Sequence, residues 1–388
     1  MEDLVRIRDL SVRFYTYEGV VQAIEHMDLD IRKGETLGIV GETGSGKTMT
    51  AMAILRLIPY PGKIESGSII FTESGLRGEV DLLTLSEDRM RSLRGNKMSM
   101  VFQEPSAALN PVFTIGDQIA EVYLLHRRHE VGYRAMQQVE GLLADGKGNP
   151  LAGLRRPFWR WQRRLYCKIA QESHPLEPRI VARIPFFNRL LWRLRDEAEL
   201  LTVNILRDVE IPDPARVAKE YPHELSGGMK QRAVIAMALA CSPKLLIADE
   251  PTTSLDVTIQ AQILELFRRI KVERGSSILY ITHNLGVAAE ICDRVAVMYA
   301  GRLCEVAGVE EIFSNPLHPY TRALLDAIPR PGKEPQPIPG TLADQFSPPP
   351  GCYFHPRCPN AMPICNQEVP ELKEVSKDHL VACHLFNL

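Results

Sequence analysis

The stretch Gly41-Glu-Thr-Gly-Ser-Gly-Lys-Thr48 decides the fold of this 388-residue chain. It fits the pattern G-x-x-x-x-G-K-[ST], in which the backbone N–H groups of a glycine-rich loop cradle phosphate oxygens. The apolar run Thr36–Val40 before it predicts a strand, and the apolar stretch from Thr48 to Leu57 predicts a helix. An ordinary glycine turn does not require this strand–loop–helix context, so the sequence predicts a phosphate-binding loop.

The residue types of the loop suit a nucleoside triphosphate with Mg²⁺. Lys47 supplies a compact positive charge for the β and γ phosphates, and the hydroxyl of Thr48 is a ligand for Mg²⁺. The residues expected to contact nucleotide here are Gly41, Glu42, Thr43, Gly44, Ser45, Gly46, Lys47, Thr48 and Met49.

A second motif, Leu245-Leu-Ile-Ala-Asp249-Glu250, is an apolar strand that ends in two carboxylates. Two adjacent carboxylates after a buried strand are costly without a cation. Asp249 is therefore expected to hold Mg²⁺, and Glu250 to polarise the attacking water. The motif is weak alone but strong about 200 residues after a phosphate-binding loop.

A third motif, Leu225-Ser-Gly-Gly-Met-Lys-Gln231, begins an apolar, helix-like stretch. Ser226 is a good N-cap, and Gly227 and Gly228 allow a close approach of the backbone to an anion. A plain capped helix is the alternative. A second phosphate-binding helix start indicates a dimer, in which each chain's second site completes the first site of its partner.

Other segments of the sequence predict further strands and a helix. The alternating segment Val5–Phe14 predicts a strand with one buried face, while Lys244–Ala248 and Ser277–Ile281 are typical of buried parallel strands. The segment Ile259–Ile270 predicts a helix. Strands that alternate with helices indicate an α/β fold with a mostly parallel central sheet.

The composition narrows the class of protein. Apolar residues make up 45% of the chain, and 46 basic against 48 acidic side chains give a formal net charge of −2. This balance disfavours a general nucleic-acid binder. No stretch approaches the ~20 apolar residues that span a bilayer, and the start lacks the apolar region of a secretory signal. We expect a cytoplasmic protein, with membrane-embedded partners if it acts on a membrane process.

These motifs, in this order, resemble the ATP-binding subunits of ABC transporters over most of the chain. Gly41–Thr48 resembles the Walker A motif, Lys244–Glu250 the Walker B motif, and Leu225–Gln231 the ABC signature, which in the family contacts the partner chain's nucleotide. The resemblance implies an ABC ATPase, with a P-loop NTPase core and a helical subdomain. It also implies ATP and Mg²⁺ as cofactors.

The resemblance assigns roles to further residues. Gln103 matches the Q-loop glutamine that touches Mg²⁺, Ser254-Leu-Asp256 resembles the D-loop, and His283 matches the switch histidine that senses the γ-phosphate. The expected catalytic residues are Glu250, His283 and Gln103, and the expected Mg²⁺ ligands are Thr48, Gln103 and Asp249.

An aromatic ring is expected against adenine. Phe14 falls where the family places this ring, and Tyr15 and Tyr17 are close competitors.

Finer resemblances point to the oligopeptide/dipeptide importers. The segments that carry them are Gln103–Pro111, Thr114–Gln118 and Asn315–Leu324. Members of this branch usually work as a heterodimer of two related ATPases under two membrane permease subunits, fed by an external solute-binding protein. The resemblance thus implies a subunit on the cytoplasmic face of the cell membrane that powers import of peptides or related solutes. The branch also contains nickel and sugar importers, which leaves the solute open.

A soluble ABC ATPase of translation or DNA repair is the alternative outside transport. Translation factors of this type usually carry two ATPase units per chain, and this chain has a single Walker A motif. Repair proteins place long coiled coils or zinc modules between Walker A and signature, whereas the insertion here is short and lacks heptads. Transport is therefore favoured.

Four of the eight cysteines gather at the end of the chain, at positions 352, 358, 365 and 383. The spacings of Cys352, Cys358, Cys365 and Cys383 are wider than the C-x2-4-C pairs of zinc sites, and four thiolates also suit a [4Fe–4S] cluster. Some members of the importer branch have such a set, assigned there to an iron–sulfur cluster. We favour this cluster in a structural role. Zn²⁺ is the alternative, with His355, His379 and His384 as further ligands, and a redox sensor is a third interpretation.

The sequence divides into four predicted segments. Residues 1–102 and 241–310 form the nucleotide-binding core, 103–240 a helical subdomain with an insertion at about 127–198, and 311–388 a C-terminal domain with the cysteines. The insertion holds all three tryptophans, and residues 155–195 contain eleven basic side chains against two acids. Arginines among aromatics suit a membrane surface or a partner, with an inert solvated insertion as the alternative.

Overall fold

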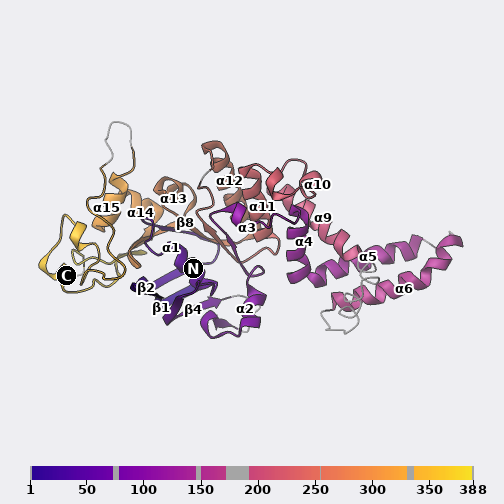
Figure 1. Cartoon of the computed structure of the whole chain (residues 1–388), viewed down its shortest axis with the longest axis horizontal. Coiled ribbons are helices and arrows are strands. Elements are labelled where there is room, and N and C mark those ends of the chain that lie inside the picture. The colour runs from indigo at the N-terminus through magenta and orange to yellow at the C-terminus, as the bar shows by residue number, and fades with distance from the viewer. Residues whose placement is uncertain are drawn as a thin grey trace. The chain divides into compact units, whose positions relative to one another are not determined.

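The computed structural model describes residues 2–72, 78–145, 150–171, 192–253, 255–329 and 336–386. The chain divides into two compact units, which are described separately. Unit 1 consists of Met1–Gln103 and Lys244–Leu388, and unit 2 is Glu104–Pro243. Figure 1 labels their elements.

Unit 1 is built around a sheet that is eight-stranded in the described residues, in the order β11-β12-β10-β9-β3-β8-β7-β6. The strands from β9 to β6 run parallel, and β10, β12 and β11 extend the sheet in antiparallel fashion. The strands are β3 (Thr36–Val40), β6 (Met98–Val101), β7 (Leu245–Asp249), β8 (Ser277–Thr282), β9 (Arg294–Tyr299), β10 (Arg302–Gly308), β11 (Lys373–Ser376) and β12 (His379–Val381). The predicted α/β fold with a mostly parallel central sheet is confirmed.

A second sheet in unit 1 is antiparallel, and the sequence analysis did not predict it. Its order is β2-β1-β4-β5, from β1 (Asp3–Thr16), β2 (Gly19–Arg32), β4 (Gly62–Thr72) and β5 (Glu79–Asp81). The segment predicted as a strand over Val5–Phe14 lies within β1, but it belongs to this sheet. Register shifts along β1 break its alternation of buried and exposed residues, which obscures the pattern in the sequence.

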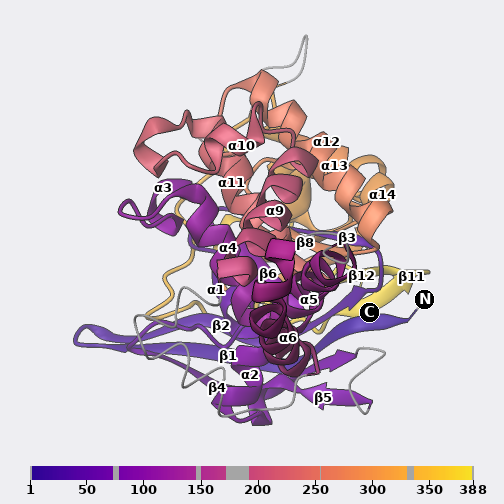
Figure 2. The ribbon, with the colours of Figure 1, turned by 90° about the vertical axis from the view of Figure 1, so that its right-hand side faces the viewer.

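The helices in the described part of unit 1 are α1 (Lys47–Ile54), α2 (Glu87–Leu93), α12 (Val257–Arg274), α13 (Leu285–Ile291), α14 (Val309–Ser314) and α15 (Pro319–Asp326). Three of them, α12, α13 and α14, lie together on one side of strands β3 and β8 of the central sheet (Figure 2). The apolar core joins the two sheets and α1, with Ile7, Ile39 and Ile247 fully buried in it. Helix α1 is shorter than predicted, because Arg56 takes a left-handed φ of 51° just after it.

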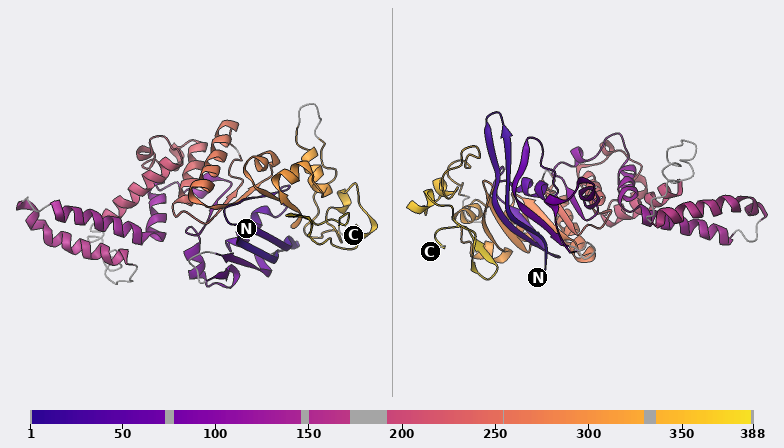
Figure 3. Two further views of the ribbon diagram at one scale, coloured as in Figure 1. Left: turned by 180° about the vertical axis from the view of Figure 1, so that it is seen from behind. Right: turned by 90° about the horizontal axis from the view of Figure 1, so that it is seen from below.

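Unit 2 is helical in its described part (Figure 3). Its helices are α3 (Pro105–Ala108), α4 (Ile115–His126), α5 (Arg128–Asp145), α6 (Pro150–Ala170), α9 (Trp192–Asp208), α10 (Pro214–Val217) and α11 (Gly227–Leu239). Helices α5 and α6 pack side by side (Figure 1).

Helix α6 carries part of the basic insertion. It buries Leu165, Tyr166 and Ile169, while Phe158 and Trp161 stack on each other and stay about 40% exposed. The rest of the basic run, residues 172–191, lies outside the described part of the chain.

Candidate nucleotide site

The predicted phosphate-binding loop joins β3 to α1 in unit 1. Two of its glycines are required by the backbone. Gly46 precedes α1 with φ of 100°, and a Cβ at Gly41 would lie 2.1 Å from the carbonyl oxygen of Met298. Ser45 is fully buried, and its hydroxyl has no hydrogen-bond partner among the described residues. A buried, unpartnered hydroxyl in such a loop fits a site for phosphate oxygens.

Lys47 is the cation of the loop and is only 5% exposed. Its Nζ donates to the carbonyl oxygens of Gly41 at 2.9 Å and of Glu42 at 3.0 Å. Burial lowers the pKa of Lys47, while the acidic side chains of Glu250, Asp249 and Glu42 act in the opposite direction. A buried cation held by neutral carbonyls is suited to anionic phosphates.

Asp249 ends β7 beside the start of α1. The hydroxyl of Thr48 donates to Asp249 Oδ1 at 3.2 Å, so the two predicted Mg²⁺ ligands meet. Burial raises the pKa of Asp249, and the hydrogen bond from Thr48 lowers it in part. The carboxylate is thus poorly solvated where it stands, which favours a cation next to it.

The substitution Asp249→Asn is expected to stabilise the nucleotide-free protein while abolishing Mg²⁺-dependent hydrolysis. The raised pKa means that the folded state binds more protons than the unfolded state as pH rises from about 4, so wild-type stability falls over that range. An amide of the same shape avoids this cost, and the melting temperature at pH 7 should rise by a few degrees.

Thermal unfolding of both proteins over a pH series checks this, with the exposed Asp88→Asn as the matched control. The difference between Asp249→Asn and wild type should shrink at the acidic end. An Asn variant that melts below wild type at pH 7 would contradict the prediction.

Glu250 follows Asp249 and gathers three side chains. Gln103 Nε2 donates to Glu250 Oε2 at 3.3 Å, Thr253 Oγ1 donates to the same oxygen at 3.0 Å, and His283 Nδ1 lies 3.1 Å from Glu250 Oε1. Glu250 itself has a left-handed φ of 45°, a strained conformation for a residue with a side chain. The predicted catalytic residues Glu250, His283 and Gln103 therefore come together, and Thr253 joins them without having been predicted.

The predicted signature lies in unit 2 at the start of α11. Ser226 caps this helix by accepting from the Met229 N–H at 3.4 Å, and Ser226 and Gly227 are exposed. Nothing would obstruct a Cβ at Gly227 within 4 Å, so the helix start is open. An exposed helix N-terminus fits contact with an anion on another molecule.

The remaining predicted residues are placed as follows. The ring of Phe14 packs against Gly62 of β4 and the core, whereas Tyr15 is 44% exposed and donates from its hydroxyl to Glu65. Asp256 caps α12 by accepting from the Ile259 N–H at 2.9 Å. Met49 packs against the core, and Ser254 lies outside the described residues.

The cysteine set lies in unit 1. Cys352, Cys358, Cys365 and Cys383 line one small cavity. Burial raises the pKa of Cys352 to about 11, and the other three thiols oppose its ionisation further.

The structure does not bear out a metal site in the tail. Within the described ranges, no group of three or more His, Cys, Asp or Glu side chains is arranged to hold a metal ion. His379 is bound to Glu305, His384 to the carbonyl of Glu368, and His355 to the carbonyl of Cys352. Each histidine uses one ring nitrogen in these contacts, and none of the three belongs to a metal-holding group in the described part of the chain.

Sequence reasoning missed three side chains that touch the loop from the C-terminal region. They are Tyr320, Gln345 and Arg357, which contact Glu42 or Gly44. No local pattern marks them, because the contacts join residues about 300 positions apart.

Comparison with known proteins identifies the family to which the chain belongs. A family model described as "ABC transporter" matches residues 24–253, and one described as "Oligopeptide/dipeptide transporter, C-terminal region" matches residues 304–365. The chain is 41% identical to the dipeptide transport ATP-binding protein DppD of Bacillus subtilis, over 99% of this chain and 95% of that protein. It is 39% identical to the oligopeptide transport ATP-binding protein OppD of Salmonella typhimurium, over 98% and 93%.

The chain therefore belongs to the ABC transporter family and carries the C-terminal region of its oligopeptide/dipeptide branch. As a member of that family, it is an ATPase that powers transport. Its fold is similar to the ATP-binding cassette MJ0796, described as a dimer in a post-hydrolysis state bound to ADP and Pi. The TM-score is 0.53 with 21% identity, over 79% of this chain and 98% of the cassette. No described helix combines the length and apolarity needed to cross a membrane.

Proposed function

We propose that this chain is the ATP-hydrolysing subunit of an importer of di- or oligopeptides. The observation that carries the proposal is the meeting of Glu250 with Gln103 and His283, next to the Thr48–Asp249 pair. The peptide class is supported by the names of the relatives, which refer to dipeptide, oligopeptide and peptide transport or import. The match covers nearly the whole length of each of them. Those names favour transport over a role in translation or DNA repair.

We assign the following roles to the residues. The loop N–H groups and Lys47 would bind the phosphates, and Thr48, Asp249 and Gln103 would hold Mg²⁺, which would neutralise charge on the phosphate oxygens. Glu250 accepts hydrogen bonds from Gln103 and Thr253, which orient its carboxylate as the base for an attacking water. His283, whose Nδ1 lies 3.1 Å from the other carboxylate oxygen of Glu250, would sense the γ-phosphate.

The active unit is proposed to be a dimer with two ATP molecules at the interface. The helix start at Ser226–Gly228, where Ser226 and Gly227 are exposed, would face the nucleotide held by the partner's loop, and the N-terminus of α11 would add a favourable dipole. The partner is a second, related ATPase. Two permease subunits in the membrane and an extracellular solute-binding protein complete the importer, with this chain on the cytoplasmic face.

Reconstitution tests the proposal. The chain, purified with its co-expressed partner ATPase and permeases in proteoliposomes, should hydrolyse ATP faster when a binding protein loaded with peptide is supplied. Uptake of labelled peptide that requires ATP supports the peptide class. Uptake of nickel or a sugar with no response to peptide would contradict it.

We further propose that the four-cysteine cavity holds a [4Fe–4S] cluster in a structural role. In such a cluster each thiolate binds a different iron, so the sulfurs stand farther apart than around one ion with Zn–S bonds of about 2.3 Å. The support for the proposal is that all four thiols line one cavity. Coordination would also offset the burial that opposes thiolate formation at Cys352.

Metal analysis distinguishes an iron–sulfur cluster from a zinc site. Anaerobically purified protein should contain iron and acid-labile sulfide in about equal amounts with a broad visible absorption, and Cys365→Ser should lose both. Cys241→Ser changes a buried cysteine in unit 2 and should keep the iron. Zinc in place of iron, or iron that survives Cys365→Ser, overturns the proposal.

A further inference from the structure

The C-terminal region contacts the phosphate-binding loop directly within unit 1. The hydroxyl of Tyr320 accepts from the Glu42 N–H at 3.0 Å, and Arg357 donates through Nη1 and Nη2 to the Glu42 carboxylate at 2.8 and 3.2 Å. Gln345 Nε2 donates to the Gly44 carbonyl at 2.6 Å. The side chain of Leu342 lies beside Gly44 as well.

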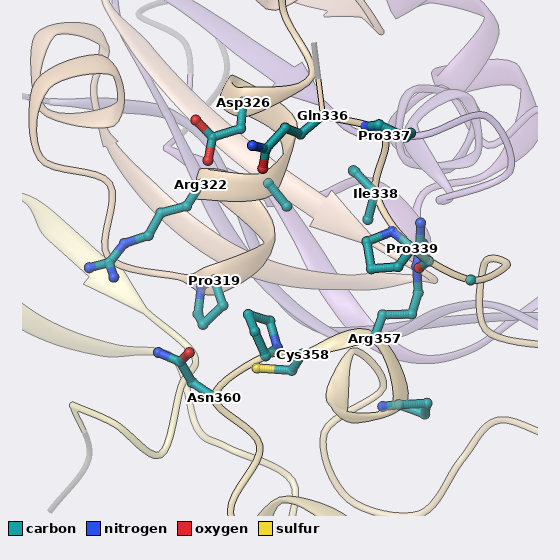
Figure 4. Close-up of a pocket in the computed structure, with 14 residues that line it drawn as sticks. Pro319, Arg322, Asp326, Gln336, Pro337, Ile338, Pro339, Arg357, Cys358 and Asn360 are labelled. Carbon is teal, nitrogen blue, oxygen red and sulfur yellow. The ribbon is translucent and has the colours of Figure 1, made fainter. Parts of the chain in front are cut away.

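Two of the three side chains that make these contacts are buried, whereas the Gln345–Gly44 contact is exposed. Arg357 is 8% exposed and Tyr320 is fully buried. Arg357 also donates to the Pro339 carbonyl at 2.8 Å and to the hydroxyl of Tyr299 at 3.3 Å, which fixes the guanidinium. Figure 4 shows Arg357 beside Pro339. A guanidinium held by a carboxylate, a carbonyl and a hydroxyl keeps one orientation.

Arg357 and Gln345 engage acceptor groups of the loop, which a phosphate cannot use, while Tyr320 engages the Glu42 N–H. The Gly44 carbonyl and the Glu42 carboxylate repel an anion, and here each accepts a hydrogen bond from the C-terminal region. Neutralising them lowers the electrostatic cost of bringing phosphate to the loop. It also fixes the loop before nucleotide arrives, so less conformational entropy is lost on binding.

We propose that Arg357, Tyr320 and Gln345 are positioning residues for the nucleotide, so that the C-terminal region is part of the ATP site of this subunit. The inference rests on the assignment of Gly41–Thr48 as the phosphate loop. Arg357 directly precedes Cys358, whose N–H donates to the His355 carbonyl, so the contact from Arg357 to the loop comes from within the cysteine segment.

The test measures MgADP binding to the full-length subunit by calorimetry, since ADP avoids turnover. Arg357→Gln should raise the Kd roughly tenfold, equivalent to about 1.4 kcal/mol. Arg357→Lys should recover part of the loss, because it restores charge without the two-pronged contact. Tyr320→Phe removes only the hydroxyl and should weaken binding several-fold. In ATPase assays of the complex, KM for ATP should rise more than kcat falls.

A matched control separates positioning from general destabilisation. Arg294 is equally buried and pairs with Glu35 at 3.1 and 3.2 Å, away from the loop. Arg294→Gln should lower the melting temperature and leave the Kd for MgADP unchanged. The proposal fails if Arg357→Gln and Tyr320→Phe bind MgADP within twofold of wild type, or if Arg294→Gln weakens binding as much. If wild type itself binds no MgADP, the assignment of the phosphate loop fails instead.

Discussion

The variant Glu250→Gln should bind ATP with near wild-type affinity and hydrolyse it at least ~100-fold more slowly, the range expected for loss of a general base. Glutamine keeps the shape of the side chain and can still accept from Gln103 or Thr253, but it cannot take a proton from water. With hydrolysis blocked, ATP should hold the dimer closed, so a stable ATP-dependent dimer accumulates.

Size-exclusion chromatography and phosphate release together measure this result. Glu273→Gln changes an exposed glutamate near the end of α12 and is the matched control, with turnover expected at the wild-type level. Turnover that persists in Glu250→Gln would show that another group activates the water. Loss of both turnover and ATP binding would show that the variant disturbs the loop rather than the chemistry.

The variant Lys47→Met should lose nucleotide affinity by about 100-fold or more, equivalent to about 2.7 kcal/mol. Lys47 is the buried cation of the loop, and hydrogen bonds to charged groups contribute about 1.5–3 kcal/mol each. Methionine fills a similar volume and carries no charge, so the loop should stay folded. The nucleotide-free variant should be no less stable than wild type, because burial of this ammonium costs free energy.

Calorimetry with MgADP and thermal unfolding give the two readouts. Lys244→Met removes an exposed lysine just before β7 and should change neither. Nucleotide affinity of Lys47→Met within tenfold of wild type would contradict the assignment of Lys47 to the phosphates.

The sequence was sufficient for the parts of the site that short segments determine. The loop from Gly41 to Thr48, the end of β7 at Asp249 and the end of β8 before His283 all lie at the carboxyl ends of parallel strands, where a sheet brings them together. The family resemblance assigned Glu250 and His283 to one site, and His283 Nδ1 lies 3.1 Å from Glu250 Oε1.

Other features depend on packing between distant segments and leave no local pattern. Glu42 meets Arg357 across 315 positions and Tyr320 across 278. The antiparallel sheet is a different case, because Met27 to Arg32 of β2 alternates apolar and polar residues and buries the apolar ones. This segment carried a period-two pattern that the sequence analysis did not use.

The hairpin of β11 and β12 has a consequence for how the chain can be shortened. It pairs along β10 through Glu305 and Val306, and it occupies the outer edge of the central sheet. A chain that stops before Lys373 would leave the backbone N–H and C=O groups of β10 open to strands from other molecules, and fully buried Glu305 would lose His379. Such a truncated protein should aggregate edge to edge, so the last two strands protect solubility as well as fold.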